Sequence, residues 1–116
     1  METTLAIIKP DAYKRGYTGK IIDRIIQEGF NIKKMKQVLL SKEKAESFYD
    51  IHRDRPFFGE LVEFMSSGNC VVLSLKRENA VNKWREVIGA TNPEEAEQGT
   101  IRALYGKNTG SNAVHG

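Results

Sequence analysis

The sequence has little of what marks secreted or membrane-spanning proteins. Among its 116 residues there is one cysteine, Cys70, so no disulfide can form within the chain. A lone cysteine is typical of proteins that work in a reducing compartment. Near the N-terminus the longest apolar run is Leu5 to Ile8, which is far too short for a membrane span or for the apolar part of a signal peptide. We therefore expect a cytoplasmic protein that makes no use of a membrane.

Several common catalytic motifs are missing as well. The sequence has no Gly-x-x-x-x-Gly-Lys-Ser/Thr loop, no Gly-x-Gly-x-x-Gly pattern and no Gly-x-Ser-x-Gly turn. One cysteine and two distant histidines, His52 and His115, do not have the spacing of a zinc site. Phosphate or nucleophilic chemistry in this chain must therefore come from other residues.

The charge and composition are those of an ordinary globular protein. Lysine and arginine number 18 against 15 acidic residues, which gives a formal charge of +3. This small positive excess permits anionic ligands but does not require a nucleic acid. Hydrophobic residues make up 40% of the chain and charged residues 28%, and the length predicts one domain, residues 1–116.

Hydrophobic periodicity predicts alternating strands and helices before residue 90. Strands are expected at residues 4–10, 31–40 and 70–76, and helices at 18–30, 41–52, 56–68 and 78–89. Thr18 and Ser41 are candidate N-caps, and Gly29 and Gly89 are candidate helix ends. This order favours an α+β sandwich in which helices cover a sheet.

The end of the sequence must supply the last strand. The sole candidate is "NAVHG", residues 112–116, and a long stretch with four glycine or proline residues precedes it from 90 to 111. Only the start of that stretch looks helical, with Asn92 as a cap and Pro93 at the first position. A loop of this length is typically functional or disordered.

Three features do not fit a purely structural pattern. Lys9 stands at the end of an otherwise apolar strand. Phe57 falls outside the apolar face of its helix. It is interpreted either as a contact for another subunit or as the wall of a pocket. His115 follows apolar residues, and a free imidazole titrates near ~6.5, so its neutral form has a lone pair for nucleophilic attack. A structural histidine is the other interpretation, and His52, beside Arg53, reads as a surface or capping residue.

Short motifs in one fixed order point to a family. These are "IIKPDA", "HRDRPFF", "LVEFMSSG", "ENAV", "WREVIGATNP", "QGTIR" and "NAVHG". Together, and at these spacings, they closely resemble the nucleoside diphosphate kinase family from about Leu5 to Gly116. The coincidence of "TNPEEAEQGTIR" with "NAVHG" is highly specific.

The resemblance implies both a fold and a reaction. The fold would be a ferredoxin-like α+β sandwich, with a four-stranded antiparallel sheet covered by helices and a long glycine-containing loop before the last strand. The reaction would move the γ-phosphate of a nucleoside triphosphate, typically ATP, onto a nucleoside diphosphate, and so maintain nucleotide pools. It would proceed by a ping-pong mechanism through a phosphohistidine, which lets one nucleotide site serve both halves.

The resemblance also assigns roles to individual residues. His115 would be the nucleophile, with Lys9 and Tyr49 beside it as catalytic residues. Nucleotide binding would fall to Lys9, Phe57, Leu61, Arg85, Thr91, Arg102 and Asn112. Lysine, arginine and threonine would contact phosphates, Asn112 the sugar hydroxyl, and Phe57 with Leu61 the base. Stacking on an aromatic ring tolerates every base, so we expect broad nucleotide choice.

The implied cofactor and partners follow the same family. Mg²⁺ would bridge the nucleotide phosphates, with no metal ligand from the protein. The chain would form a homo-oligomer, a hexamer rather than a tetramer, without a membrane and without a required nucleic acid.

The sequence departs from the family pattern at a few positions. The family usually continues past this histidine-glycine pair with Ser-Asp-Ser, a helix and a glutamate that orients the histidine, so its C-terminal tail is expected to be missing here. Leu104, Ser111 and Asn69 replace a common aspartate, arginine and proline. These departures keep open an alternative: a catalytically impaired member that acts as a nucleotide-binding, nucleic-acid-binding or assembly protein. Ferredoxin-like sheets also bind RNA, although the paired aromatic strand motifs of that class are absent.

Overall fold

A four-stranded antiparallel sheet lies at the centre of the protein. The structure, a computed structural model, describes residues 1–116. The strands are β1 (Glu2–Ile8), β2 (Asn31–Leu39), β3 (Asn69–Arg77) and β4 (Val114–His115). Their order across the sheet is β2-β3-β1-β4, so the first strand is central and the short last strand pairs with it. This is the predicted ferredoxin-like arrangement.

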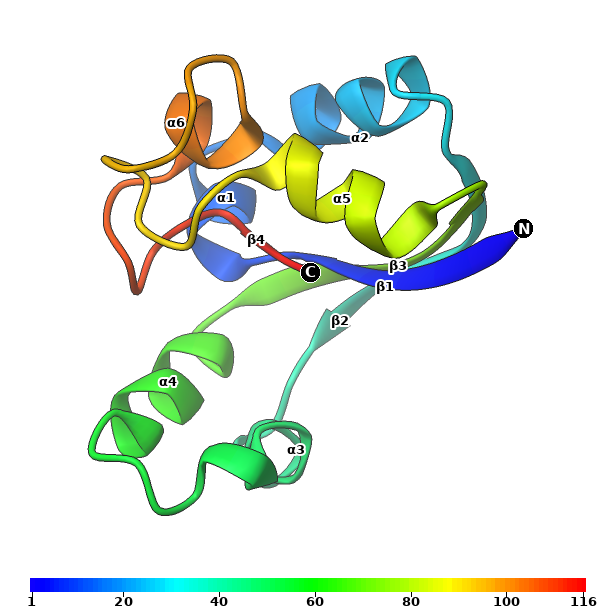
Figure 1. Cartoon of the computed structure of the whole chain (residues 1–116). Helices are drawn as coiled ribbons and strands as arrows, with labels where there is room; N and C mark the ends of the chain where they lie inside the picture. Colours follow the sequence, from blue (N-terminus) through cyan, green and yellow to red (C-terminus); the bar gives the residue numbers. More distant parts are fainter.

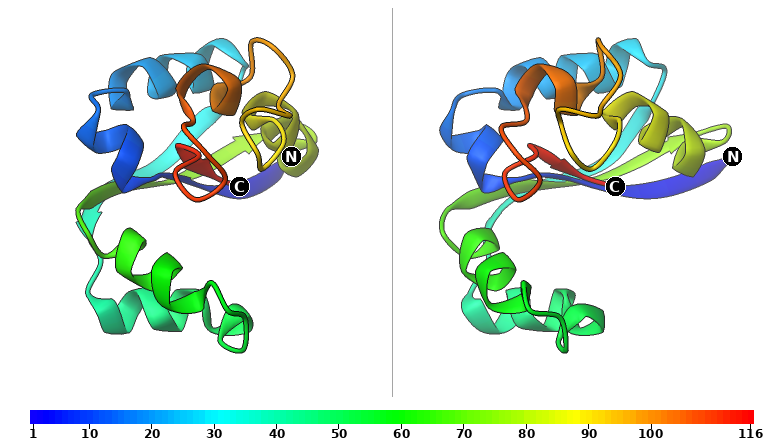
Figure 2. Two further views of the ribbon diagram at one scale, coloured as in Figure 1. Left: turned by 90° about the vertical axis from the view of Figure 1, so that its left-hand side faces the viewer. Right: turned by 60° about the vertical axis from the view of Figure 1, so that its left-hand side comes forward.

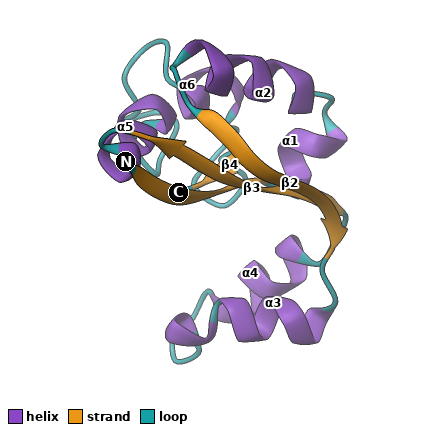
Figure 3. Cartoon of the chain, turned by 90° about the vertical axis from the view of Figure 1, so that its right-hand side faces the viewer, coloured by secondary structure: helices purple, strands orange, loops and turns teal.

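Helices cover the two faces of the sheet unequally (Figure 1). One face carries α1 (Pro10–Lys14), α2 (Thr18–Gln27), α5 (Ala80–Ile88) and α6 (Ile101–Tyr105). The other face carries a hairpin of α3 (Lys42–Phe48) and α4 (Phe58–Met65), joined through a 3₁₀ turn at Asp50–His52. Figures 2 and 3 show from other directions that this hairpin projects away from the sheet.

The apolar run of the first strand is explained by its two covered faces. Ala6 and Ile8 belong to a core of 16 buried residues beneath α2 and α5, whereas Ile7 belongs to a core of 6 buried residues under the hairpin. Successive side chains of a strand point to opposite faces. Where helices cover both sides, the strand therefore needs apolar residues at successive positions, as at Ala6–Ile8, whereas the exposed start of β1 carries Glu2 and Thr3.

Several predicted helix boundaries are confirmed. The Ser41 hydroxyl accepts a hydrogen bond from the Lys44 amide at 3.1 Å, as an N-cap does. Gly29 follows the last residues of α2 with φ of +83°, a conformation that L-residues with a side chain avoid. Gly89 closes α5 as expected.

Other predictions about local structure were wrong. Thr18 does not cap α2, because Tyr17 occupies the N-cap and the Thr18 hydroxyl is buried without a partner. The predicted helix at 41–52 ends at Phe48, and the long stretch before the last strand is not helical at its start. Helix α6 forms later, where the Thr100 hydroxyl accepts a hydrogen bond from the Ala103 amide at 3.3 Å. The short helix α1, with Pro10 at its start, was not predicted.

Candidate active site

A cavity of about 720 Å³ opens between the end of the sheet and the α3–α4 hairpin. Its lining includes seven of the nine residues that the resemblance selects. These seven are Lys9, Phe57, Leu61, Thr91, Arg102, Asn112 and His115. They come from five separate segments of the chain, so the fold brings together residues that lie up to 106 positions apart.

The floor of the cavity is held by a chain of hydrogen bonds. The buried Lys9 ammonium donates to the Asn112 side-chain oxygen at 2.7 Å, and the Asn112 amide donates to the Thr91 carbonyl at 2.9 Å. Lys9 directly follows β1, which places it beside β4. The position of this lysine is explained, because its charge lies in the cavity rather than in the core.

His115 is held mainly through its backbone. It pairs with Ile7 in the sheet, and its carbonyl accepts a hydrogen bond from the Trp84 indole N–H at 3.1 Å. Edge-to-face contacts then confine the imidazole, with the rings of Phe48 and Tyr49 at centroid distances of 5.8 and 6.2 Å. Neither ring nitrogen of His115 has a hydrogen bond within the chain.

Tyr49 contacts the nucleophile candidate without lining the cavity. Its ring packs against His115, and its buried hydroxyl has no hydrogen-bond partner. Burial, followed by the nearby Cys70, raises the pKa of Tyr49 to about 12, so the hydroxyl keeps its proton at neutral pH. His52 stands between the rings of Tyr49 and Phe57, at 6.5 and 5.6 Å, which gives it a packing role that the surface interpretation missed.

The electrostatics of the cavity favour a neutral imidazole. Burial, followed by the charges of Lys9 and Arg102, lowers the pKa of His115 to about 4. The ring is therefore uncharged at pH 7, and one nitrogen has its lone pair free. Burial, followed by Arg102, lowers the pKa of Lys9 to about 8, against an opposing effect of Asp11. An anionic group in the cavity would restore full charge on this lysine.

Arg102 has a structural task beside its place in the lining. Its guanidinium donates to the Gly89 carbonyl at 3.0 Å and to the Val114 carbonyl at 2.9 Å. These bonds tie the end of α5 to β4 across the loop, while the buried Nε atom has no partner. Sequence reasoning assigned only a phosphate contact and missed this tie.

The segment that leads into His115 has a strained backbone. The Val114 amide donates to the Asn112 carbonyl at 2.9 Å, which closes a three-residue γ-turn with Ala113 at its centre. The φ angle of Ala113 is 74°, which a residue with a Cβ rarely adopts. Such strain costs on the order of 1–3 kcal/mol and persists only where surrounding contacts determine it. The turn spaces Asn112 and His115 along one wall of the cavity.

A steric constraint explains why a glycine, Gly116, follows the nucleophile candidate. A Cβ at Gly116 would collide with the indole ring of Trp84, which is buried in the main core. Glycine at position 116 is therefore required for the close approach of β4 to α5.

Arg85 is the one predicted site residue that the structure leaves apart. It is exposed in the last turn of α5, does not line the cavity and forms no side-chain hydrogen bond within the chain. The long side chain starts from the same helix as Trp84, one residue along the chain from it.

The structure adds lining residues that sequence reasoning missed. These are Glu60, Phe64, Thr109, Gly110, Ser111 and Gly116. Phe64 had a signal, since it lies outside the apolar face of α4. Glu60 is the sole carboxylate side chain among the lining residues, so cationic side chains outnumber it.

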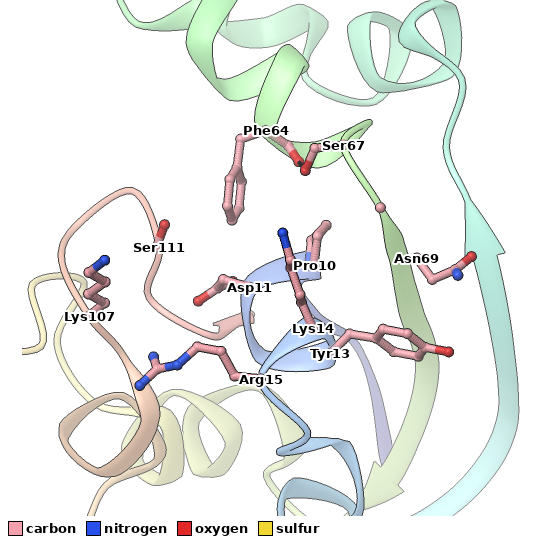
Figure 4. A pocket seen from close by; sticks show the side chains of 11 residues that line it. Pro10, Asp11, Tyr13, Lys14, Arg15, Phe64, Ser67, Asn69, Lys107 and Ser111 are labelled. Atoms are coloured by element: carbon pink, nitrogen blue, oxygen red, sulfur yellow. Dashed lines mark hydrogen bonds between the residues drawn. The ribbon is translucent and has the colours of Figure 1, made fainter.

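A second cavity, of about 590 Å³, lies next to the first and shares Phe64 and Ser111 with it (Figure 4). Its charged residues are Lys14, Arg15 and Lys107, with Asp11 as the one carboxylate. The chain has no group of three or more histidine, cysteine or acidic residues placed to hold a metal ion. None of its helices combines the length and apolarity needed to cross a membrane.

Comparison with known proteins identifies relatives along the whole chain. The sequence pattern of the nucleoside diphosphate kinase family matches residues 2–116. The chain is 53% identical over 116 residues to nucleoside diphosphate kinase from Persephonella marina, which covers 100% of this chain and 83% of that protein. It is 58% identical over 116 residues to the enzyme from Campylobacter jejuni, covering 100% of this chain and 85% of that protein.

Solved structures agree with these matches. The nucleoside diphosphate kinase of Aquifex aeolicus is similar with a TM-score of 0.97 and 53% identity, covering 98% of this chain and 83% of that one. The enzyme of Halobacterium salinarum, solved in complex with CDP, gives a TM-score of 0.95 and 35% identity over 98% of this chain and 75% of that one. The predicted fold and enzyme class are confirmed, and the impaired-member alternative is not favoured. Nucleotide substrates, a divalent metal ion and an oligomeric assembly follow from the family. The chain belongs to the nucleoside diphosphate kinase family of phosphotransferases.

Proposed function

We propose that His115 is the residue that carries the phosphoryl group. The observation that supports this role most directly is that a neutral imidazole lines a cavity whose charged side chains are mainly cationic. A nucleophile in such a cavity meets the polyphosphate chain of a nucleoside triphosphate, because cations attract and orient it. The reaction is the transfer of the γ-phosphate, typically of ATP, to a nucleoside diphosphate.

Each half of the reaction uses the same groups. The His115 lone pair attacks the γ-phosphorus, the bond from that phosphorus to the bridging oxygen breaks, and the nucleoside diphosphate leaves with the electron pair. A second diphosphate then attacks the phosphohistidine with a terminal phosphate oxygen and leaves as the triphosphate. Because His115 is already neutral at pH 7, no separate base has to deprotonate it. Ping-pong kinetics follow.

The polar residues of the cavity suit the phosphates and the sugar. Lys9 and Arg102 are buried cations close to β4, and Thr91 is an exposed residue of the lining. We assign these three, together with Arg85, to the phosphates, with Arg85 reaching in from the outer surface of α5. Asn112 is assigned to the ribose hydroxyl, beside Lys9, whose ammonium is bonded to its side-chain oxygen. Tyr49 is assigned to the support of the imidazole ring.

The apolar wall suits the base. Phe57 lines the cavity and is 47% exposed, so a base that enters the cavity can reach it. Leu61 lies one helical turn further along α4. A ring and an aliphatic side chain read no hydrogen-bond pattern, which supports broad base choice. The CDP complex of the Halobacterium salinarum relative is consistent with a pyrimidine in such a site.

The metal is proposed to be Mg²⁺ that enters with the nucleotide. The charged side chains of the cavity are one carboxylate, Glu60, and two cations, Lys9 and Arg102. A single carboxylate beside two cations binds a bare divalent ion poorly, whereas the cations suit a metal–nucleotide complex. When bound, the metal would neutralise phosphate charge.

The assembly and compartment are proposed from the family and two structural features. The chain is expected to act as one domain, residues 1–116, and to assemble as a hexamer rather than a tetramer. Exposed Met35 and Leu39 on the edge strand β2 provide an apolar surface that assembly would cover. The buried, unpaired thiol of Cys70 fits the reducing cytoplasm.

The test is covalent labelling with γ-labelled ATP and Mg²⁺. The unaltered protein should take up an acid-labile label and release it to GDP. Equal labelling of His115→Ala would overturn the assignment of the nucleophile, whereas no labelling of the unaltered protein together with retained nucleotide binding would revive the impaired-member alternative.

A further inference from the structure

The γ-turn before the nucleophile is held from one side by a single segment of the chain. The Lys9 amide donates to the Ala113 carbonyl at 2.8 Å, and the Ala113 amide donates to the Asp11 carboxylate at 3.1 Å. Both polar backbone groups of the strained residue are therefore satisfied by the junction between β1 and α1. The Ala113 methyl group is completely buried, so the turn has no solvent contact that would replace these bonds.

The position of the Asp11 carboxylate is energetically unfavourable. Its Oδ2 atom accepts from Ala113, but its Oδ1 atom is buried without any hydrogen-bond partner. Burial raises the pKa of Asp11, against the opposing effects of the Ala113 amide and of Lys9. A half-satisfied buried carboxylate is not a good source of fold stability. This arrangement indicates that the residue serves the turn it holds.

The turn in question decides the geometry of the site. It separates Asn112, which is bonded to Lys9, from His115, whose imidazole has no hydrogen bond of its own. The aim of the imidazole consequently depends on where the backbone of residues 112–115 lies. Figure 4 shows the Asp11 side chain pointing toward the loop that carries Ser111, the residue just before this turn.

We propose that Asp11 is a positioning residue for phosphoryl transfer: by accepting the Ala113 amide it locks the strained turn that sets His115 at the correct distance from the bound phosphate. This role rests on the proposed function of His115. Asp11 does not line the cavity that contains His115, and its carboxylate acts through the backbone of the turn. Its negative charge has a second effect, because it favours the charged form of the neighbouring Lys9.

Two substitutions separate the hydrogen bond from the charge. Asp11→Asn keeps an oxygen that accepts from Ala113 and removes the charge, whereas Asp11→Ala removes both. The readout is the single-turnover rate of His115 phosphorylation at saturating ATP, measured on folded protein. We expect Asp11→Ala to lose roughly 100-fold, as a displacement of about 1 Å at a reacting group does, and Asp11→Asn to stay within roughly threefold at pH 7.

A stability control separates positioning from general weakening. Ile25→Ala removes a fully buried side chain of α2, and Ile25 lines neither of the two cavities. It should lower the melting temperature and leave the phosphorylation rate unchanged. A fall in melting temperature for Asp11→Ala with an unchanged phosphorylation rate overturns the proposal, because the residue would then be structural only.

A pH profile provides a second readout if Asp11→Ala does not fold. Asp11 shares its surroundings with the cations Lys9, Lys14, Arg15 and Lys107, and Lys9 is the buried one. In Asp11→Asn the fall in nucleotide affinity above pH 8 should begin at a lower pH, since Lys9 loses its anionic neighbour. The amide of Ala113 should remain protected from hydrogen exchange in this variant. Rapid exchange of Ala113 combined with full activity contradicts the proposal. Failure of the unaltered protein to label at all would instead count against the function of His115.

Discussion

The two faces of the sheet differ in how firmly their helices are attached. On the face of α2 and α5, a core of 16 buried residues surrounds Trp84 and continues into β4. On the other face, the α3–α4 hairpin is held by a core of 6 buried residues, and Phe48, Ile51 and Phe57 are exposed on it. Lys9, Arg102 and the backbone of His115 are attached to the well-packed part, whereas the His115 imidazole packs against Phe48 and Tyr49 of the hairpin. The lightly packed hairpin carries the apolar wall for the base.

This difference matches what each part has to do. Phosphoryl transfer depends on groups held in position to a fraction of an ångström, so the backbone that carries the phosphate end of the cavity belongs to the better-packed part of the fold. A base contact that tolerates purines and pyrimidines needs no such precision. We infer that Phe57 and Leu61 on α4 can adjust to the nucleotide while the backbone of His115 stays fixed.

Arg102→Ala should give the largest effect, because this residue serves both the phosphates and the packing. Removal of the guanidinium leaves the carbonyls of Gly89 and Val114 without their donor, which costs about 2–4 kcal/mol in the free energy of unfolding. Loss of a phosphate contact should lower kcat/KM by roughly 1,000-fold. Urea unfolding and steady-state kinetics measure the two. Arg102→Lys keeps the charge but not the planar guanidinium group with its several donors. Unchanged stability and activity in Arg102→Lys would count against the role of the hydrogen bonds to the Gly89 and Val114 carbonyls.

Phe57→Ala should weaken binding without weakening the fold. A base–aromatic stack contributes about 1–3 kcal/mol, so KM should rise roughly 10- to 100-fold. The melting temperature should stay unchanged, because the ring is 47% exposed. Ile51→Ala is the matched control: it removes an 88% exposed apolar side chain from the same hairpin, and Ile51 does not line the cavity. A KM increase of the same size in the control would remove the stacking interpretation.

The difference in attachment can be measured directly by amide hydrogen exchange. Helices with few buried contacts open locally at lower free energy than those packed on the main core. Amides of α4 should exchange roughly tenfold or more faster than those of α5, and a bound nucleotide should slow them. Equal protection of the two helices in the free protein would show that the hairpin is as rigid as the rest.

The smallest expected effect is an uptake of protons when the nucleotide binds. Because the pKa of Lys9 is about 8 in the free protein, a nucleotide that binds at pH 8–9 should raise this pKa and draw a fraction of a proton from the buffer. Calorimetry in two buffers of different ionisation enthalpy measures the uptake. Lys9→Met should abolish it, and uptake that persists in this variant would mean that another group is responsible.

The sequence pattern predicted the elements better than the connections. Alternating apolar residues indicated the strands, and Lys9 stood out because a charge at the end of a buried strand needs a reason. Helix α6 was missed because its five residues are too few for a periodic pattern, although Thr100 is a good capping residue. The γ-turn could not be predicted, since nothing in the residue type Ala113 indicates a positive φ. It results from contacts with Lys9 and Asp11, more than 100 residues away in the chain.

The sequence predicted most residues of the site, but not the contacts that these residues make with one another and with the backbone. The motifs selected seven of the residues that line the cavity. They did not indicate that Arg102 ties two backbone segments together, or that Arg85 lies outside the lining. Hydrogen bonds to backbone carbonyls depend on the tertiary arrangement, and no residue pattern in one sequence records them.

Whether His115 is the nucleophile can be measured as the single-turnover rate of phosphorylation by γ-labelled ATP between pH 5 and 7, with the labelled peptide identified. The pKa of His115 lies near 4, well below its ordinary value of 6.5, so the imidazole remains neutral across this range. The proposed role of His115 requires label on the peptide that contains this residue and a rate that stays flat from pH 7 to 5. Label on another residue, or a rate that falls with a midpoint near pH 6.5, would contradict it.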